Sequence, residues 1–295
     1  MYYNDDTVIF LDGNFVKAAE AKTDLYSQSL HYGYGVFEGI RAYQTVNGVK
    51  IFKAHEHYER LKNSASLIGI PFDYSPEELT QITYQVLAKN NQSNAYIRPL
   101  VFCAPNMSLT APSKVSLMIA TWEWGKYLGD QLLKVCVSSY QRPNPKSVKV
   151  EAKACGHYVN SILATTEAKQ RGFDEGLMLD MEGFVAEGPG ANFFYEKDGV
   201  LYTPPRGSIL PGITRQTVLE ICAELDLRVE EKKFKPEDFF EADSAFFCGT
   251  AAEVIGIESI EGQKFAKPWK ESLGAIVQEA YRCLVMDKSY SYVIV

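Results

Sequence analysis

The chain has few cysteines for its length, six in 295 residues, and no two of them form a Cys-x-x-Cys pair. Their irregular spacing suits neither a zinc ribbon nor a disulfide framework, so we expect reduced thiols. No apolar run reaches the ~18 residues that a membrane span needs, and the N-terminus has no basic stretch before an apolar one. These absences favour a cytoplasmic protein with no membrane span and no secretory signal.

Positive charge is also in short supply, with 30 lysines and arginines against 37 aspartates and glutamates. The resulting net charge of −7 and the pI near 5.3 disfavour a nucleic acid as the main ligand. A small phosphate ligand in a local basic pocket is compatible with this balance. Hydrophobic residues make up 46% of the chain, which is enough to build one large or two medium cores.

Turn signals and apolar periodicity predict a small α+β domain over residues 1–121. Asp-Gly and Asn-Gly lie between β-prone residues in 8–16 and 46–52, a pattern typical of hairpins and therefore of antiparallel sheet. Apolar residues recur at helical spacing from residue 54, and Ser75-Pro-Glu-Glu is typical of a helix start. The expected helices are 54–69 and 76–90, and the expected strands are 95–102 and 115–121.

The segment 122–132 breaks this periodicity, with two glycines and three aromatic residues within Trp122–Asp130. It is either an interdomain connection that also contacts a ligand or an ordinary packed loop, and the segment alone leaves both open. A second, larger domain is predicted over residues 133–295. Its expected elements are a strand at 133–139, helices at 158–171, 213–225 and 269–287, and a hairpin that turns at Asp198-Gly199.

Lys153 and Glu187 are the two charged residues whose surroundings suggest chemistry. Lys153 lies among small residues in 151–158, just before a predicted helix, and a lysine there is usually only solvated. If buried, it can lose its proton and form a Schiff base with an aldehyde. Glu187 lies between an apolar strand and a glycine-rich turn, where its charge needs a partner. That partner is either a pyridinium nitrogen or the backbone amides of the turn, which Glu187 would then cap.

Two further segments can present unpaired backbone amides. Leu210-Pro-Gly-Ile-Thr214 opens the helix predicted at 213–225, and Cys248-Gly-Thr-Ala-Ala252 follows an apolar strand. Helix starts and small-residue turns bind phosphate oxygens without a large basic patch, and each threonine adds a hydroxyl group. Sequences of both kinds are also common in ordinary turns and helix starts, so neither segment alone is strong evidence of a phosphate site.

In this order and spacing, the four segments resemble the class IV pyridoxal-phosphate aminotransferases, and within them the branched-chain amino acid aminotransferases. The resemblance extends over about residues 7–286 and includes Tyr34-Gly-Val-Phe-Glu-Gly-Ile-Arg-Ala-Tyr43, His57-Tyr-Glu-Arg-Leu61, Ala95-Tyr-Ile-Arg-Pro99 and Trp124-Gly-Lys-Tyr-Leu-Gly129. The Phe-Glu-Gly-Ile-Arg stretch is typical of the branched-chain group. The resemblance implies a two-domain α+β fold of type IV, like that of D-amino acid aminotransferase, with pyridoxal 5'-phosphate in the cleft between the domains.

The resemblance also implies a role for each matching cofactor residue. Lys153 would form the Schiff base with pyridoxal phosphate and move the proton between the substrate α-carbon and the cofactor. Tyr158 would hydrogen-bond the phenolic oxygen of the cofactor, and Glu187 would keep its pyridine nitrogen protonated. The residues implied at the phosphate are Arg60, Gly212, Ile213, Thr214 and Thr250.

The implied substrate pocket combines side chains of two subunits, so a homodimer or a higher homo-oligomer is expected. The implied lining is Phe37, Tyr96, Trp124 and Tyr158, with Tyr32 of the partner subunit and Leu109 of the partner subunit, and with the amides of Thr250 and Ala251 at the α-carboxylate. Arg98 shares a strand face with Tyr96 and would bind the carboxylate of glutamate, unless it forms only a surface ion pair. The implied reaction is ping-pong transfer of the amino group from L-leucine, L-isoleucine or L-valine to 2-oxoglutarate.

Two positions depart from many relatives, His157 in place of asparagine and Cys248 in place of a small or hydroxyl residue. Neither has a role above. His55 and His57 suggest a metal site, but residues two apart on a helix point away from each other, so no metal is expected. The alternatives to a branched-chain aminotransferase are a D-amino acid aminotransferase, an aminodeoxychorismate lyase and a cofactor-free α+β binding protein.

Overall fold

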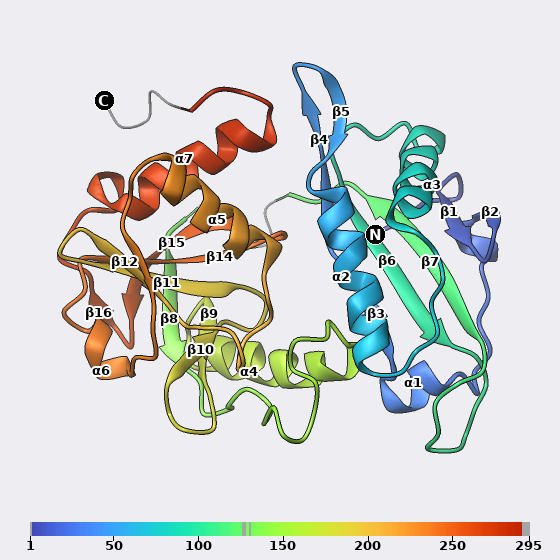
Figure 1. Ribbon diagram of the computed structural model, residues 1–295, viewed down its shortest axis with the longest axis horizontal. Coiled ribbons are helices and arrows are strands. Elements are labelled where there is room, and N and C mark those ends of the chain that lie inside the picture. Colours follow the sequence, from blue (N-terminus) through green and yellow to red (C-terminus); the bar gives the residue numbers. More distant parts are fainter. Residues whose placement is uncertain (1, 126–127, 130, 291–295) are drawn as a thin grey trace. The chain divides into compact units, whose positions relative to one another are not determined.

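The computed structural model describes residues 2–125, 128–129 and 131–290 (Figure 1). Contacts divide the chain into a first unit, Met1–Gly125 with Ala152–His157, and a second unit, Lys126–Glu151 with Tyr158–Val295. This division differs from the expected domains 1–121 and 133–295, because the first unit continues to Gly125 and also takes in the segment that carries Lys153. The part of the expected connection at 126–127 and 130 lies outside the described residues.

The first unit contains an antiparallel sheet with the strand order β2-β1-β7-β6-β4-β5, and β3 also pairs with β6. Its strands are β1 (Val8–Leu11), β2 (Asn14–Lys17), β3 (Gly35–Phe37), β4 (Ile40–Thr45), β5 (Gly48–Ile51), β6 (Ala95–Cys103) and β7 (Val115–Trp122). The predicted hairpin of β1 and β2 is confirmed. Asp12 and Gly13 both have positive φ, as a tight two-residue hairpin turn requires.

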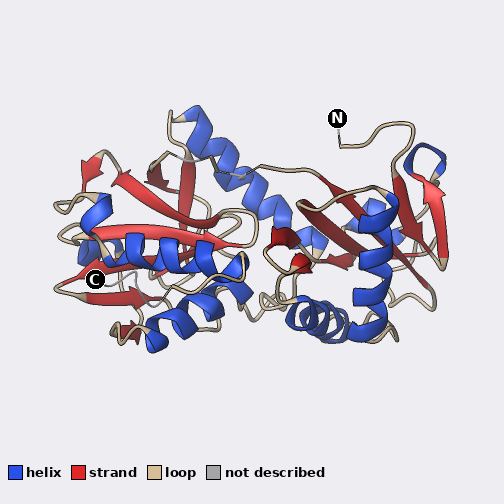
Figure 2. Cartoon of the chain, turned by 90° about the horizontal axis from the view of Figure 1, so that it is seen from above, coloured by secondary structure: helices blue, strands red, loops and turns tan. Residues whose placement is uncertain are grey.

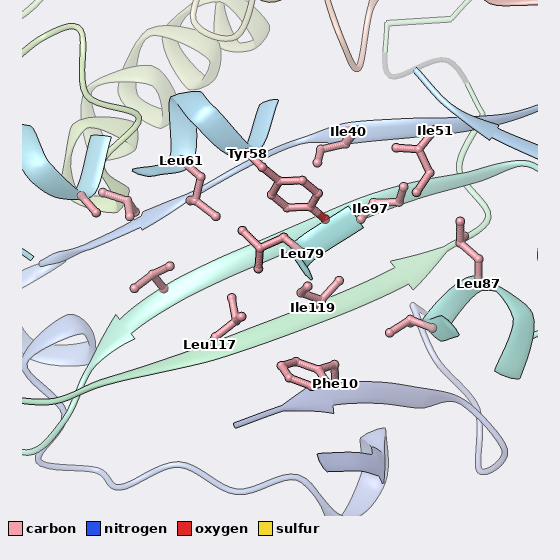
Figure 3. Close-up of a cluster of buried hydrophobic side chains, with 14 of the residues drawn as sticks. Phe10, Ile40, Ile51, Tyr58, Leu61, Leu79, Leu87, Ile97, Leu117 and Ile119 are labelled. Carbon is pink, nitrogen blue, oxygen red and sulfur yellow. The ribbon is translucent and has the colours of Figure 1, made fainter. Parts of the chain in front are cut away.

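The helices of this unit are α1 (Gln28–Tyr32), α2 (Ala54–Leu67) and α3 (Pro76–Lys89), together with a short 3₁₀ turn at Ala18–Glu20. The predicted start of α3 is confirmed, because Ser75 and Glu78 form a reciprocal capping box. Figure 3 shows Tyr58 and Leu61 of α2 among apolar side chains of β4, β6 and β7. Each large apolar side chain that is fully buried here contributes about 1.5–3 kcal/mol, so this core fixes α2 on the sheet.

The second unit is built on a mixed sheet with the order β10-β9-β8-β15-β14-β11-β12-β13, and β16 pairs with β15. Its strands are β8 (Leu133–Val137), β9 (Glu175–Leu179), β10 (Val185–Glu187), β11 (Asn192–Lys197), β12 (Val200–Thr203), β13 (Val229–Glu231), β14 (Ser244–Gly249), β15 (Glu253–Ile260) and β16 (Gln263–Lys264). An additional pairing of β10 with β11 closes the path from β10 to β11 into a ring. Asp198-Gly199 forms the predicted turn between β11 and β12, again with positive φ at both residues.

The helices of the second unit are α4 (Tyr158–Gln170), α5 (Ile213–Glu224), α6 (Pro236–Phe239) and α7 (Leu273–Val285), and a 3₁₀ turn covers Trp269–Glu271. α5 and α7 contact each other and β14, α7 also contacts β15, and α4 contacts β9. Figure 2 shows helices, in blue, lying along red strands in the part of the chain that carries the C-terminus. The final helix was expected to begin at residue 269. It begins at Leu273 because Ser272 caps it, accepting a hydrogen bond from the amide of Ala275.

Helices and mostly antiparallel sheet occur together in each unit, so the predicted α+β class is confirmed. Within the described part of the chain, no helix has both the length and the apolar character that a bilayer crossing demands.

Candidate active site

Lys153 is held by its main chain against the first unit. The amide of Phe37 donates to the Lys153 carbonyl at 3.1 Å, and the Lys153 amide donates to Ser64 Oγ at 3.0 Å. The next residue, Ala154, forms an isolated bridge with Val36 of β3. The side chain extends over Phe37, with Nζ 5.0 Å from the ring centroid. Tertiary contacts therefore place this lysine at the end of β3, although the sequence predicted it within the larger domain.

Arg98 is surrounded by aromatic rings. Its guanidinium carbon lies 4.7 Å from the ring centroid of Phe37, 5.4 Å from that of Tyr96 and 5.8 Å from that of Trp122. Nη2 donates to the Tyr96 hydroxyl at 3.4 Å, whereas the buried Nε has no hydrogen-bond partner among the described residues. No carboxylate in the described part of the chain pairs with Arg98, so the structure does not contain the surface ion pair that the sequence left open.

The aromatic group continues through Trp124. Its ring lies edge-on to Tyr96, with 4.8 Å between the centroids. Arg41 donates to the carbonyls of Trp124 at 3.1 Å and Gly125 at 2.9 Å. These hydrogen bonds hold the start of the expected connection at 122–132 against β4 of the first unit. Residues 122–125 are therefore packed, and the Trp124 indole lies beside the Tyr96 ring that Arg98 contacts.

Arg60 is paired with a carboxylate that the sequence reasoning did not select. Its Nε and Nη2 donate to the two oxygens of Glu38 at 2.7 and 2.9 Å. The same carboxylate is 2.7 Å from Nδ1 of His57, and Glu38 and His57 are almost completely buried. His55 is exposed and lies beside Glu77 instead, and no cluster suited to a metal occurs among the described residues.

Glu187 is buried in the second unit at the end of β10. Its Oε1 accepts from the Leu210 amide at 3.0 Å, and its Oε2 accepts from Asn192 Nδ2 at 2.9 Å. Arg142 Nε lies 3.0 Å from Oε1, close enough for an ion pair but too poorly aligned for a hydrogen bond. Leu210 lies far beyond the turn that follows Glu187, so these contacts differ from the simple turn cap that the sequence left open.

The start of α5 packs against the same residues. Gly212 is its N-cap and offers no side-chain hydrogen bond, so the first amides of α5 receive no acceptor from their own cap. A Cβ on Gly212 would lie 1.9 Å from Oδ1 of Asn192, which leaves space only for glycine. Thr214 is buried in the first turn of the helix. This end of α5 thus lies next to the partner of Glu187.

The turn at Thr250–Ala252 joins β14 to β15 near these groups. Cys248, two residues before Thr250, pairs with Asn192 across the sheet, and a Cβ on Gly249 would lie 3.1 Å from the Gly190 carbonyl. The turn therefore borders the loop that follows Glu187. Cys248 itself is fully buried, so this departure from many relatives points into the core.

Tyr158 and His157 lie at the start of α4. Tyr158 is the first residue of the helix and is half-buried. His157 directs Nδ1 to the carbonyl of Ala152 at 3.2 Å, so this second departure braces the Lys153 segment.

Tyr32 and Leu109 lie on an apolar surface of the first unit. Tyr32 is 45% exposed and Leu109 is 87% exposed. The Tyr32 hydroxyl donates to the carbonyl of Met107 at 3.2 Å, which joins α1 to the segment that carries Leu109. Exposed apolar side chains that form a contiguous surface are typical of an interface, so Tyr32 and Leu109 are available for a partner subunit.

The predicted site residues thus form two groups, one in each unit. Lys153, Phe37, Tyr96, Arg98, Trp124 and Arg60 belong to the first unit, and Glu187, Gly212, Ile213, Thr214, Thr250, Ala251 and Tyr158 belong to the second. Sequence reasoning missed the partners Glu38, Asn192 and Arg142. Asn192 could have been found from its position five residues after Glu187, whereas Arg142 carries no local signal.

Each unit, taken by itself, offers groups that suit part of a phosphorylated pyridine aldehyde. The second unit offers a buried carboxylate suited to a protonated ring nitrogen and an uncapped helix start suited to a phosphate. The first unit offers the Lys153 amine beside the Phe37 ring, and it offers Arg98, which has no carboxylate partner among the described residues.

Comparisons with known proteins agree with this chemistry. Residues 35–260 match the family described as Amino-transferase class IV. A branched-chain-amino-acid aminotransferase of Pseudomonas aeruginosa is 42% identical over 293 residues, which cover 97% of this chain and 95% of the relative.

Two solved structures have the same fold over nearly their whole length. A branched-chain aminotransferase from Thermoproteus uzoniensis, crystallised with norvaline, has a TM-score of 0.93 and 40% identity, and the match covers 98% of this chain and 97% of that one. A T.th. branched-chain amino acid aminotransferase, complexed with N-(5'-phosphopyridoxyl)-L-glutamate, has a TM-score of 0.90 and 36% identity, with 97% and 96% covered.

Proposed function

The chain belongs to the class IV aminotransferase family, as its motifs predict, and from this premise we propose that it is a pyridoxal-phosphate-dependent branched-chain aminotransferase. It transfers the amino group of L-leucine, L-isoleucine or L-valine to 2-oxoglutarate. Family membership makes the chain an enzyme, which removes the cofactor-free binding protein from the alternatives. A cytoplasmic location stays a prediction.

The observation that carries the proposal is the environment of Arg98. One pocket must accept an aliphatic side chain in one half-reaction and the second carboxylate of glutamate in the other. The rings of Phe37, Tyr96 and Trp122 supply apolar surface, and the guanidinium among them supplies a cation without a carboxylate partner in the described part of the chain. A desolvated cation favours a ligand that brings the opposite charge, while the rings favour an aliphatic group.

The known ligands of similar proteins support both halves of this proposal. The structure of the T.th. enzyme contains a compound that joins the phosphopyridoxyl group to L-glutamate, and the Thermoproteus structure contains norvaline, which has an aliphatic side chain. An apolar pocket separates neighbouring aliphatic side chains by only about 1–3 kcal/mol per methylene, so leucine, isoleucine and valine should all react.

The residues of this chain then have distinct tasks. Pyridoxal phosphate, when bound, supplies an electron sink for negative charge at the substrate α-carbon. Lys153 would hold the cofactor through its aldehyde group and would move the proton at the substrate α-carbon, and Phe37 gives the Lys153 amine an apolar neighbour. Glu187 would hold the proton on the ring nitrogen, and Asn192 and Arg142 orient its carboxylate.

The other residues bind and orient. Arg60, the first amides of α5 and the hydroxyls of Thr214 and Thr250 hold the phosphate, and Tyr158 binds the phenolic oxygen. The amides of Thr250 and Ala251 hold the substrate α-carboxylate. Phe37, Tyr96, Trp124 and Tyr158 line the side-chain pocket, with Tyr32 of the partner subunit and Leu109 of the partner subunit completing it in a homodimer.

A substrate comparison tests the proposal. The purified protein is supplied with pyridoxal phosphate and 2-oxoglutarate, and L-glutamate formation is measured with L-leucine, L-isoleucine, L-valine or D-alanine as donor. Activity with the three L-amino acids and none with D-alanine is expected. Activity with D-alanine alone, or pyruvate release from aminodeoxychorismate without transamination, would instead identify one of the other class IV enzymes.

A further inference from the structure

Glu38 is a completely buried carboxylate beside the residues of the proposed site. It follows Phe37 directly at the end of β3, and its main-chain amide donates to the carbonyl of Pro99 on β6 at 2.9 Å. This hydrogen bond holds the main chain of Glu38 against β6 at Pro99, the residue that directly follows Arg98 in the sequence. Glu38 has no direct task in the proposed reaction, so its burial needs another explanation.

One face of α2 carries the groups that meet Glu38 and Lys153. His57, Arg60 and Ser64 follow one another at spacings of three and four residues, which places them in a row along a helix. His57 and Arg60 contact the Glu38 carboxylate, and Ser64 accepts the Lys153 amide. The same helix face therefore holds the main chain of Lys153 through Ser64 and carries the Arg60 guanidinium that pairs with Glu38.

The Glu38 carboxylate contacts one guanidinium, that of Arg60, and one imidazole, that of His57. Burial by itself raises the pKa of Glu38, but Arg60 and His57 outweigh it and hold that pKa far below its usual range. Burial lowers the pKa of His57, and Nδ1 of its ring lies 2.7 Å from Oε2 of Glu38. The carboxylate is therefore ionised, and its two oxygens face Nε and Nη2 of Arg60 in a fork that fixes the plane of the guanidinium.

We infer that Glu38 is a positioning residue that acts through Arg60 and sets its guanidinium for the cofactor phosphate. The inference rests on the proposed function, because it takes the phosphate of pyridoxal phosphate as the ligand of Arg60. His57 contacts Oε2 of the same carboxylate, so Glu38, His57 and Arg60 form one hydrogen-bonded group. Arg60 has the longest side chain of the three.

Removing the charge of Glu38 has two opposed effects on phosphate binding. It leaves Arg60 more positive, which favours an anion, and it removes both hydrogen bonds that orient the guanidinium. The second effect dominates because the arginine side chain is already 10% exposed and an unpaired guanidinium turns toward water rather than staying buried. Glu38→Gln should therefore weaken the binding of phosphate-bearing cofactor.

The test compares two probes, pyridoxal phosphate and pyridoxal, which lacks the phosphate. Protein freed of cofactor is titrated with each probe for the wild type, Glu38→Gln and Glu59→Gln, the last being an exposed glutamate on the same helix. Glu38→Gln should weaken binding of pyridoxal phosphate roughly ten- to a hundred-fold, the range found when a supporting partner is removed at metal sites. Pyridoxal binding should change little, and Glu59→Gln should match the wild type with both probes.

A double-mutant cycle then separates positioning from a general effect. Arg60→Met should weaken pyridoxal phosphate binding by itself, and adding Glu38→Gln to it should cause little further loss, because the group that Glu38 orients is absent. If thermal unfolding shows that Glu38→Gln does not fold cooperatively, Glu38→Asp serves instead. It keeps the charge but is too short to reach both arginine nitrogens, so the same phosphate-specific loss is expected.

Three outcomes would overturn the inference. Equal losses for pyridoxal phosphate and pyridoxal would mean that Glu38 only maintains the fold. Unchanged or tighter binding of pyridoxal phosphate would mean that orientation of Arg60 is immaterial. Additive losses in the cycle would mean that Glu38 acts independently of Arg60. A wild-type protein that binds neither probe would instead contradict the proposed function, and the inference with it.

Discussion

Replacing Arg98 with methionine should separate the two halves of the reaction. Methionine keeps an unbranched apolar stem against Phe37, Tyr96 and Trp122, so the ring contacts that a leucine side chain needs are largely preserved. The change removes the cation that we assign to the second carboxylate of glutamate. The leucine half-reaction should therefore be little affected, whereas the glutamate half-reaction loses its charge partner.

The size of the loss follows from the burial of Arg98. Its Nε is buried without a hydrogen-bond partner in the described residues, and its nearest neighbours are rings rather than carboxylates. A ligand carboxylate would thus meet a half-buried cation whose Nε is desolvated. Truncating one partner of such a pair costs about 2–5 kcal/mol, which corresponds to roughly thirty-fold to a few thousand-fold in affinity.

Single-turnover spectroscopy measures the two halves separately. Cofactor-loaded protein is mixed with L-leucine or with L-glutamate, and the change in visible absorbance gives the rate and the apparent affinity of each half-reaction. Arg228→Met is a matched control, because Arg228 is 71% exposed on the second unit and pairs only with surface Glu230 in the described structure. Equal losses with both substrates would refute the reasoning and assign Arg98 to folding or to cofactor placement.

Three further predictions concern the second unit, the main chain and the assembly. Glu187→Gln should retain the cofactor but lower kcat roughly 10²- to 10³-fold in steady-state assays, because a neutral amide cannot hold the ring proton; an unchanged kcat would contradict this. Gly33→Ala should lower the free energy of unfolding by about 1–3 kcal/mol more than Gly172→Ala in denaturant titrations, since both have positive φ but only Gly33 would push a Cβ to 2.8 Å from opposing main chain. Equal losses would rule out the clash. Sedimentation should give a homodimer that buries exposed Tyr32 and Leu109, and a fully active monomer would argue against it.

Periodic sequence patterns predicted the longer elements of the fold well. The helices expected at 54–69 and 76–90 are α2 and α3, and the expected hairpin turns at Asp12-Gly13 and Asp198-Gly199 have the positive φ values that these pairs favour. Such elements are determined by local composition and by one apolar face. That information is present in a window of a few residues.

Short elements held by distant contacts were missed. The helix α1 at Gln28–Tyr32 and the strand β3 at Gly35–Phe37 are too short for a periodic signal. They are held by Ser29, whose hydroxyl donates to the Tyr34 carbonyl at 2.5 Å and accepts the Cys103 amide at 2.8 Å. Because Cys103 lies on another strand far along the chain, no local pattern could have predicted this junction.

The candidate site shows the same difference between residues that a local motif suggests and the distant residues that contact them. The local motifs and the family they resemble suggested roles for Lys153 and Glu187, and Arg98 was proposed because it shares a strand face with Tyr96. The groups that hold these residues come from separate segments, as Ser64 does for Lys153 and Arg142 does for Glu187. Pairing across the fold is set by tertiary packing, so the sequence can propose the reactive groups but not the bonds that orient them.

We expect Lys153 to carry pyridoxal phosphate and to give it up to an L-amino acid donor. Reducing the cofactor-loaded protein with borohydride fixes any Schiff base, and peptide mass spectrometry then locates the phosphopyridoxyl group. A single modified lysine, Lys153, is expected, and the modification should be lost when L-leucine is added before the reduction. A label on another lysine, or a label on Lys153 that L-leucine does not remove, would contradict it.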